Sequence, residues 1–324
     1  MKQYVELLKG GTIYVKNHDD AQLFCQGYRD DANEILINQE TSFPTASGGK
    51  FFVAIGIMKL IEENKLSLDS KIGDVLSFDL HQIDKNVTIK ELLTHTSGIP
   101  NYFDELVHSD YSQLWTDFPN YKIRASKDLL PLFIDKPMEF NHGDHFSYND
   151  SAFVLLGIII EEVTKRPFDD FLNDLIFKPL GMNHTGYYEL DRLPKNCANA
   201  YIFDSKTNSY YTNIYSVDAK GSGAGGVFTN ALDIEKLWNG FLNYKLLKKE
   251  TVELMLTKYA QSEDGGYGLG VWLDDDLNPF IVGVDPGVTF ISWHHRINNQ
   301  SITINSNYYD NVFKIFDLIK KDIL

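Results

Sequence analysis

The order of apolar and polar positions divides the chain into three stretches. Near the start, two apolar runs (11–15 and 21–25) flank the polar turn 17–20, which predicts a β-hairpin. We expect the first forty residues to form short strands around polar turns. After Lys50, apolar residues recur at the i, i+3, i+4 spacing of one helical face, at Phe51, Ala54, Ile55, Met58 and Ile61.

The middle stretch predicts helices separated by a long irregular region. Thr88 and Glu91 have the spacing of a capping box, so a helix is expected to begin at Thr88. Residues 101–145 are rich in Tyr, Phe, Asp and Pro with weak periodicity, which indicates loops and short helices. From Ser151 a strongly apolar helix is predicted over 153–163, buried on most of its faces.

The last stretch returns to strands. A helix is expected to begin at Thr229 or Asn230, strands are expected over 288–293 and 302–305, and an amphipathic helix closes the chain over 312–319. Strands at both ends with helices between them predict an α+β fold, with an antiparallel sheet built from both chain ends and flanked by helices. The expected domains are a sheet domain, 1–76 with 196–324, and a mostly helical insertion, 77–195.

Composition narrows the possible partners. The chain has 324 residues and a formal net charge of −15, so we expect no nucleic-acid partner. Its two cysteines form neither a disulfide framework nor a zinc site alone, which fits a reducing compartment. The start lacks a signal-peptide pattern, and the longest apolar run, 153–160, is shorter than the roughly 20 residues of a membrane span. We therefore expect a cytoplasmic protein without a membrane partner, although a chain that had lost its export signal would look the same.

The first candidate for chemistry is Ser47-Gly48-Gly49-Lys50, at the junction of a strand and a helix. Positions i and i+3 of a helix share a face, so the hydroxyl and the amine can meet. Helix N-terminal N–H groups favour a developing alkoxide, and a neutral buried lysine can act as the base that a serine needs. The alternative is a surface serine and lysine beside a helix cap, which this short motif does not exclude.

Three further segments are weaker candidates on their own. Tyr148 could relay a proton beside a lysine, or it could simply precede a helix. The stretch 221–226 contains four glycines but lacks the G-K-[ST] ending of a phosphate loop, so a close approach of two backbones is the better interpretation. The segment 283–287 is predicted to be a turn that could supply an oxyanion-binding N–H. The nine histidines form no recognised metal-binding motif, and we expect neither a metal nor another cofactor.

Five ordered motifs together resemble the serine β-lactamase and penicillin-binding-protein-like family, in its class C and D-alanyl-D-alanine carboxypeptidase branch. The segment Glu91-Leu-Leu-Thr-His-Thr-Ser-Gly-Ile-Pro100 is the most specific match. The others are Thr45-Ala-Ser-Gly-Gly-Lys50, Phe146-Ser-Tyr-Asn-Asp150, Pro179-Leu-Gly-Met182 and Ala224-Gly-Gly226. The similarity covers roughly residues 10–324 and implies a β-lactamase/transpeptidase-like fold.

The resemblance also implies roles for individual residues. Ser47 would be the acylated nucleophile, Lys50 would activate it, and Tyr148 would pass the proton to the leaving group and then activate water. The N–H groups of Ser47 and Val284, next to Gly283, would form the oxyanion hole. His95 would be a structural residue beneath the site.

Two departures from the family pattern bear on the substrate. The tyrosine motif usually ends in Asn, whereas this chain has Asp150, whose carboxylate would hold Lys50 protonated and make it a weaker base. A protonated Asp150 would instead act much like an amide. The third motif usually has Lys or His two residues before its glycine, and this chain has Ile281 there. The group that often contacts a substrate carboxylate is therefore missing, which favours neutral esters or amides over penicillins and D-alanyl peptides.

The function expected from these residues is a serine hydrolase that forms an acyl-enzyme with an ester, an amide (including D-amino peptides) or a β-lactam. Its substrate would be a small molecule or a peptide, and the sequence leaves the oligomeric state open. The alternative is a catalytically inactive binding or sensor domain on the same fold. Aromatic residues of the irregular region are candidates to line the pocket or to pack in the core, namely Tyr102, Phe103, Tyr111, Trp115 and Tyr121.

Overall fold

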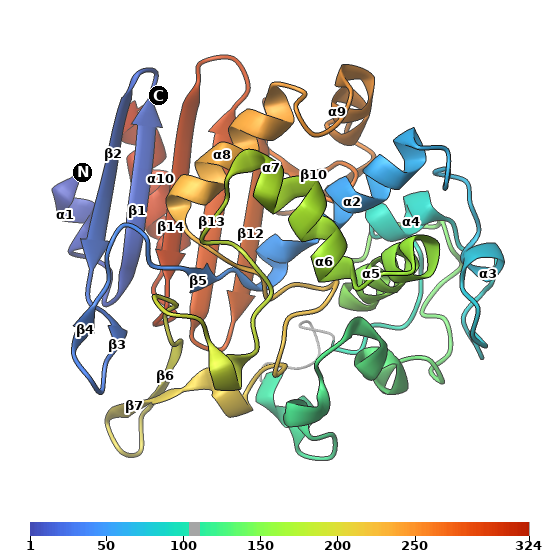
Figure 1. The fold of residues 1–324 in the computed structure, drawn as a ribbon, viewed down its shortest axis with the longest axis horizontal. Coiled ribbons are helices and arrows are strands. Elements are labelled where there is room, and N and C mark those ends of the chain that lie inside the picture. Colours follow the sequence, from blue (N-terminus) through green and yellow to red (C-terminus); the bar gives the residue numbers. More distant parts are fainter. Residues whose placement is uncertain (104–110, 324) are drawn as a thin grey trace.

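The computed structural model of the protein describes residues 1–103 and 111–323 and is built around an antiparallel sheet of eight strands. The order in space is β2-β1-β14-β13-β12-β11-β10-β9, so strands from both ends of the chain lie side by side (Figure 1). These strands are β1 (Gly11–Asn17), β2 (Asp20–Gln26), β9 (Ala260–Ser262), β10 (Gly265–Tyr267), β11 (Trp272–Leu273), β12 (Pro279–Asp285), β13 (Val288–His295) and β14 (Gln300–Ser306). The expected α+β class and two-ended sheet are confirmed.

Three two-stranded sheets accompany the large one. They pair β3 (Tyr28–Asp30) with β4 (Ile35–Leu36), β5 (Phe43–Pro44) with β8 (Phe228–Thr229), and β6 (Tyr201–Asp204) with β7 (Ser209–Thr212). The pairing of β5 with β8 fixes the point from which the chain enters η1 (Ala46–Gly49) and then α2 (Lys50–Glu62).

Helices cover both faces of the large sheet (Figure 1). The α-helices are α1 (Lys2–Val5), α2 (Lys50–Glu62), α3 (Ile72–Val75), α4 (Ile89–Leu93), α5 (Asp150–Thr164), α6 (Phe168–Leu172), α7 (Lys178–Leu180), α8 (Ala231–Leu242), α9 (Lys249–Met255) and α10 (Val312–Ile323). Short 3-10 helices are η1 (Ala46–Gly49), η2 (Tyr111–Trp115), η3 (Asn120–Lys122), η4 (Ser126–Leu132), η6 (Leu190–Arg192) and η7 (Asn213–Tyr215), and η5 (Asn173–Phe177) is a π-helix.

Successive side chains of a strand point to opposite faces of the sheet, so the sheet separates two hydrophobic clusters. Ile291 and Trp293 of β13 pack with α1 and α10 on one face, whereas Phe290 belongs to the large cluster that includes α2, α5 and α8 on the other. The helix α2 is buried on nearly all sides rather than along a single stripe. This burial fixes the N-terminus of α2 against the sheet, where the site lies.

Most predicted elements are found at the expected places. The hairpin of β1 and β2 turns at Asn17–Asp20, Thr88 makes the capping box of α4, and Asn230 caps α8. Two details were wrong: residues 2–5 form the helix α1 instead of a strand, and Gly283 to Asp285 end the strand β12, so that only Pro286 and Gly287 form the turn. Between residues 77 and 195 the described chain contains helices and turns but no strand; the division into two domains stays a prediction.

Candidate active site

The serine and the lysine of the first candidate motif lie where β5 leads into α2. Ser47 is in η1 and is half-buried, and Lys50 is the buried first residue of α2. The neighbouring chain holds η1 in place: the N–H of Thr45 donates to the carbonyl of Val227 at 3.0 Å, and that of Gly226 donates to the carbonyl of Ala46 at 2.9 Å.

The glycine-rich stretch makes this approach possible. Gly225 has φ +156°, and a Cβ atom there would lie 2.3 Å from the carbonyl oxygen of Ala46. No side chain fits in that space. The interpretation of 221–226 as a close backbone contact rather than a phosphate loop is therefore confirmed for this glycine.

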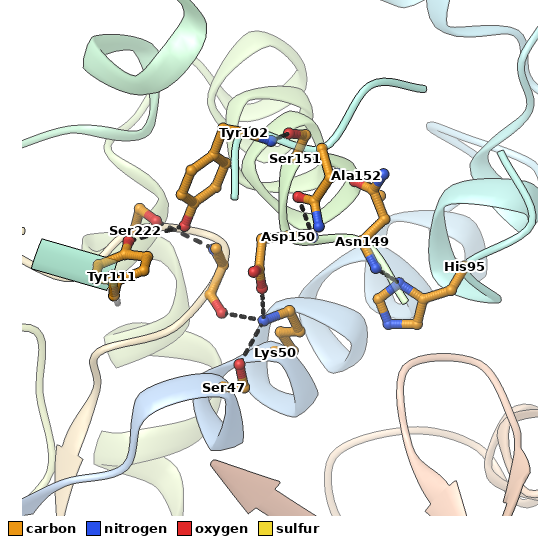
Figure 2. A network of polar contacts seen from close by, with 12 residues as sticks. Ser47, Lys50, His95, Tyr102, Tyr111, Asn149, Asp150, Ser151, Ala152 and Ser222 are labelled. Atoms are coloured by element: carbon orange, nitrogen blue, oxygen red, sulfur yellow. Dashed lines mark hydrogen bonds and ion pairs between the residues drawn. The ribbon is translucent and has the colours of Figure 1, made fainter. Parts of the chain in front are cut away.

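Lys50 is at the centre of the polar contacts (Figure 2). Its Nζ lies 2.8 Å from Ser47 Oγ, 2.6 Å from Asp150 Oδ1 and 2.5 Å from the carbonyl oxygen of Ala224. A carbonyl and an ionised carboxylate only accept hydrogen bonds, so Lys50 donates one N–H to each of them. The remaining position on Nζ faces Ser47, where an ammonium donates and a neutral amine accepts the serine proton.

The start of α5 supplies Asp150. Asn149 caps this helix, since its Oδ1 accepts from the N–H of Ala152 at 2.9 Å while its Nδ2 donates to the carbonyl of Ile99 at 2.7 Å. Asp150 is the first residue of α5, where the helix dipole favours a negative charge. The ion pair with Lys50 is buried, with both side chains almost inaccessible to solvent.

His95 supports the segment that carries Tyr148. The histidine is fully buried; its Nδ1 accepts from the N–H of Asn149 at 3.0 Å, so its Nε2 donates to the hydroxyl of Tyr267, also at 3.0 Å. Burial, and secondarily the charge of Lys50, lower the pKa of His95 well below its usual value, so the imidazole stays neutral.

The ring of Tyr148 is packed between His95, at a centroid distance of 4.3 Å, and Trp272, at 5.9 Å. Lys50 Nζ lies 5.1 Å from the centroid of the Tyr148 ring. The structure thus brings Ser47, Lys50 and Tyr148 into one cluster.

The end of β12 lies directly against η1. A Cβ atom on Gly283 would lie 2.0 Å from the carbonyl oxygen of Thr45 and 2.7 Å from the amide nitrogen of Ser47. Only glycine allows this contact, which brings the backbone of Gly283 and Val284 beside the nucleophile.

A cavity that is open to solvent adjoins Ser47. Its polar lining comes from Ser47, Tyr102, Tyr111, Asp150, Tyr188, Asn213, Asp218, Ser222 and Asp285. Tyr102 and Tyr111, which the sequence left as candidates for either the pocket or the core, line the cavity and also pack on the large hydrophobic cluster.

Two predicted substrate-binding residues do not line this cavity. Ile281 is two residues before Gly283 and shares its face of β12, but it is 3% exposed and packs in the large hydrophobic cluster beneath the site. Trp115 packs edge-on against Tyr111, behind the lining. Neither residue is among those that line this cavity, and their assignment to substrate binding stays a prediction.

Asp218 lines the cavity and was not singled out by the sequence. It lies in the loop between η7 and the glycine-rich stretch 221–226. Tyr111 donates to its Oδ1 at 3.1 Å, and the hydroxyls of Tyr111 and Tyr102 are 3.3 Å apart. Burial raises the pKa of Asp218 to about 7, and the charge of Asp150 acts in the same direction. A single aspartate in an irregular loop carries no pattern that could have identified it.

Within residues 1–103 and 111–323, no group of three or more His, Cys, Asp or Glu side chains could hold a metal ion, and Cys25 and Cys197 are both free thiols. No helix there is both long and apolar enough to cross a membrane.

The half-buried serine and the buried lysine lie in contact on this scaffold of a sheet and helices. Comparison with known families shows which class of protein has this arrangement. Residues 4–303 match the Beta-lactamase family model, and the chain belongs to that family. The resemblance inferred from the motifs is thereby confirmed.

Individual relatives extend the comparison. The putative penicillin-binding protein PbpX of Bacillus subtilis is 26% identical over 97% of this chain and 75% of its own length. A penicillin-binding protein from Bacillus halodurans has the same fold with a TM-score of 0.93 and 36% identity, covering 99% of this chain and 98% of that one. The D-amino acid amidase of Ochrobactrum anthropi, solved with L-phenylalanine amide, covers 99% of this chain and 98% of that one at 19% identity and a TM-score of 0.81, which establishes a shared fold only.

Proposed function

We propose that this protein is a serine hydrolase that cleaves an ester or amide through an acyl-enzyme on Ser47. The observation that carries the proposal is the 2.8 Å contact between Ser47 Oγ and Lys50 Nζ at the wall of an open cavity. The names of its relatives, a penicillin-binding protein and a D-amino acid amidase, point to the same chemistry on acyl groups.

In the acylation step, Ser47 Oγ attacks the substrate carbonyl carbon and forms a C–O bond. Its proton passes to Lys50, which must first give a proton away because Asp150 holds it as an ammonium. Asp150 is in contact to take that proton, and Tyr148 is the group that carries one to the departing alcohol or amine. The bond to the leaving group breaks, and the leaving group departs neutral.

In the deacylation step, Tyr148 accepts a proton from water as the water oxygen attacks the acyl carbon, which restores the Tyr148 hydroxyl. The acyl–Ser47 bond then breaks and the product leaves as an acid. Lys50 returns its proton to Ser47 Oγ, and Asp150 returns the proton it took to Lys50. Packing of Tyr148 between His95 and Trp272 supports this role, since a relay group needs a fixed ring position.

The developing oxyanion would be bound by the N–H groups of Ser47 and Val284. Pro286 and Gly287 form a two-residue turn, and the pair flanking such a turn, Asp285 with Val288, is normally hydrogen-bonded. The next pair, Val284 with Thr289, is then not hydrogen-bonded, so the N–H of Val284 points away from β13. It points to the part of the β12 edge that β11 does not cover, beside η1.

The proposed substrate preference follows from the absence of a Lys or His side chain at position 281. Ile281 stands where relatives of this branch would have Lys or His, and its side chain is buried in the core. We therefore propose weak activity on penicillins and D-alanyl peptides relative to substrates without a carboxylate. The intact cluster of Ser47, Lys50 and Tyr148 argues against an inactive binding or sensor domain. A cytoplasmic location stays a prediction from the sequence.

The test is intact-mass measurement after incubation with a fluorophosphonate and, separately, with a penicillin. We expect a single fluorophosphonate adduct on the wild type, none on Ser47→Ala, and an unchanged adduct on Ser209→Ala, an exposed serine of β7. A folded wild type that gains no adduct from either reagent would favour the inactive domain. A stable or turned-over penicillin adduct would leave the hydrolase but overturn the expected preference.

A further inference from the structure

The charge of the cavity wall beside Ser47 is the feature that the reaction chemistry leaves unexplained. Three of its lining residues are carboxylic acids, Asp150, Asp218 and Asp285, and among the lining residues outside 104–110 there is no Lys, Arg or His. Lys50 lies behind the wall and is bound to Asp150. The wall is therefore suited to a positively charged ligand group and repels an anionic one.

In the proposed mechanism, this cavity receives the acyl part of the substrate. Tyr148, which serves the leaving group in the proposed mechanism, is not among the lining residues, whereas Asp150 is. Figure 2 shows Tyr102 and Tyr111 on the opposite side of Asp150 from His95. A group bound between these tyrosines and Asp218 is thus attached to the carbonyl carbon that Ser47 attacks.

Asp218 is the carboxylate to which a ligand in the cavity can donate a further hydrogen bond. Tyr111 donates to its Oδ1 at 3.1 Å, and the backbone N–H of Asp218 itself also bonds to the carboxylate. An ionised carboxylate accepts more than two hydrogen bonds, so Asp218 can accept a further one from a ligand in the cavity. A cation placed here would restore the interactions that burial removed.

We propose that the acyl group of the substrate carries a protonated amine, and that Asp218 binds this ammonium. The proposal rests on the hydrolase function proposed above and names the substrate class of the same site. It replaces the neutral acyl group expected from the sequence with a cationic one, because the loop that carries Asp218 adds a charge that no motif indicated.

The groups that face Asp218 make the interaction dependent on pH. They are Tyr111 of η2, Tyr102, Asp150 of α5 and Asp285 of β12. Because burial raises the pKa of Asp218 to about 7, its negative charge is complete near pH 8 and largely lost near pH 6. An alkylammonium keeps its charge over this range, so recognition should weaken as pH falls.

The experiment compares two fluorophosphonates that differ in one group, a 5-aminopentyl chain and a hexyl chain on phosphorus. At pH 8 we expect the ammonium reagent to label Ser47 about 10- to 100-fold faster, the usual range for a charge-assisted hydrogen bond. The ratio should fall close to one in Asp218→Asn. It should stay at the wild-type value in Asp19→Asn, which removes the same charge from an exposed turn.

The outcomes separate the two proposals. If neither reagent labels Ser47, the hydrolase function fails and the ammonium site fails with it. If both label at equal rates, or if Asp218→Asn keeps the preference, only the ammonium site is overturned. Should Asp218→Asn not fold, the wild-type ratio decides alone: it must exceed one at pH 8 and shrink several-fold at pH 6.

Discussion

The contact between β12 and η1 makes a quantitative prediction about Gly283. In Gly283→Ala the new Cβ atom would lie 2.0 Å from the carbonyl oxygen of Thr45 and 2.7 Å from the amide nitrogen of Ser47. Both obstacles are backbone atoms, which cannot rotate away. A carbon–oxygen contact below about 3 Å is not tolerated, so the two backbones have to separate by roughly 1 Å.

A displacement of that size moves the nucleophile relative to the N–H of Val284. Misplacement by about 1 Å lowers rates by about 100-fold, whereas overpacking lowers stability by about 1–3 kcal/mol. We therefore expect Gly283→Ala to stay folded and to react with a fluorophosphonate about 100-fold more slowly. Stopped-flow or mass-spectrometric labelling rates measure the first effect, and urea unfolding measures the second.

Gly240→Ala in α8 is the matched control. The atoms nearest to its Cβ atom would belong to the flexible Leu180 side chain, at 2.5 Å and beyond, instead of to the backbone. We expect a small change in stability and the wild-type labelling rate. If Gly283→Ala labels as fast as Gly240→Ala, then the approach of β12 does not position Ser47, and the proposed oxyanion hole loses its structural basis.

Two further predictions concern protons. Asp150→Asn removes the carboxylate that is bound to Lys50, so that Lys50 can accept the Ser47 proton without first passing one to Asp150, and the labelling rate at neutral pH should rise; complete loss of labelling would instead show that Asp150 is indispensable as the proton acceptor. Burial lowers the pKa of His294 to about 4 in the native state. Between pH 6.5 and 4 the unfolded chain therefore binds a proton that the native protein does not bind. This difference should lower the free energy of unfolding by about 3 kcal/mol at pH 4. His294→Asn should remove that part of the acid sensitivity in urea unfolding, and an unchanged pH dependence would contradict the assigned cause.

The sequence predicted those helices and strands in which the local sequence signals agree with the burial found in the structure. The capping box at Thr88 and the cap at Asn230 appear because each side chain satisfies an N–H that the helix leaves free. The central strands β13 and β14 appear because β-branched and aromatic residues recur along both of them and both are buried. For the site, a hydroxyl and an amine three residues apart, Ser47 and Lys50, lie on one helical face, so their contact could be expected from spacing alone.

Other features depend on tertiary packing and left no local trace. The short strands β9 to β11 contain glycine and polar residues and exist because each pairs with its neighbour at the sheet edge. Ile281 has the correct register relative to Gly283, but the large cluster buries its side chain. Asp218 reaches the cavity only because the chain after η7 folds back across the site. The sequence pattern therefore predicted neither these edge strands nor the positions of individual side chains such as those of Ile281 and Asp218.

The two departures from the family pattern are easiest to understand together. An Asn at position 150 and a cation near position 281 would give a site with a net positive balance, suited to a substrate carboxylate. Here Asp150 cancels the charge of Lys50, Ile281 contributes none, and Asp218 adds a negative charge on the acyl side. Each change alone would only weaken anion binding. Combined, they reverse the sign of the field at the cavity, so that discrimination against anionic substrates and attraction of cationic ones arise from the same side chains.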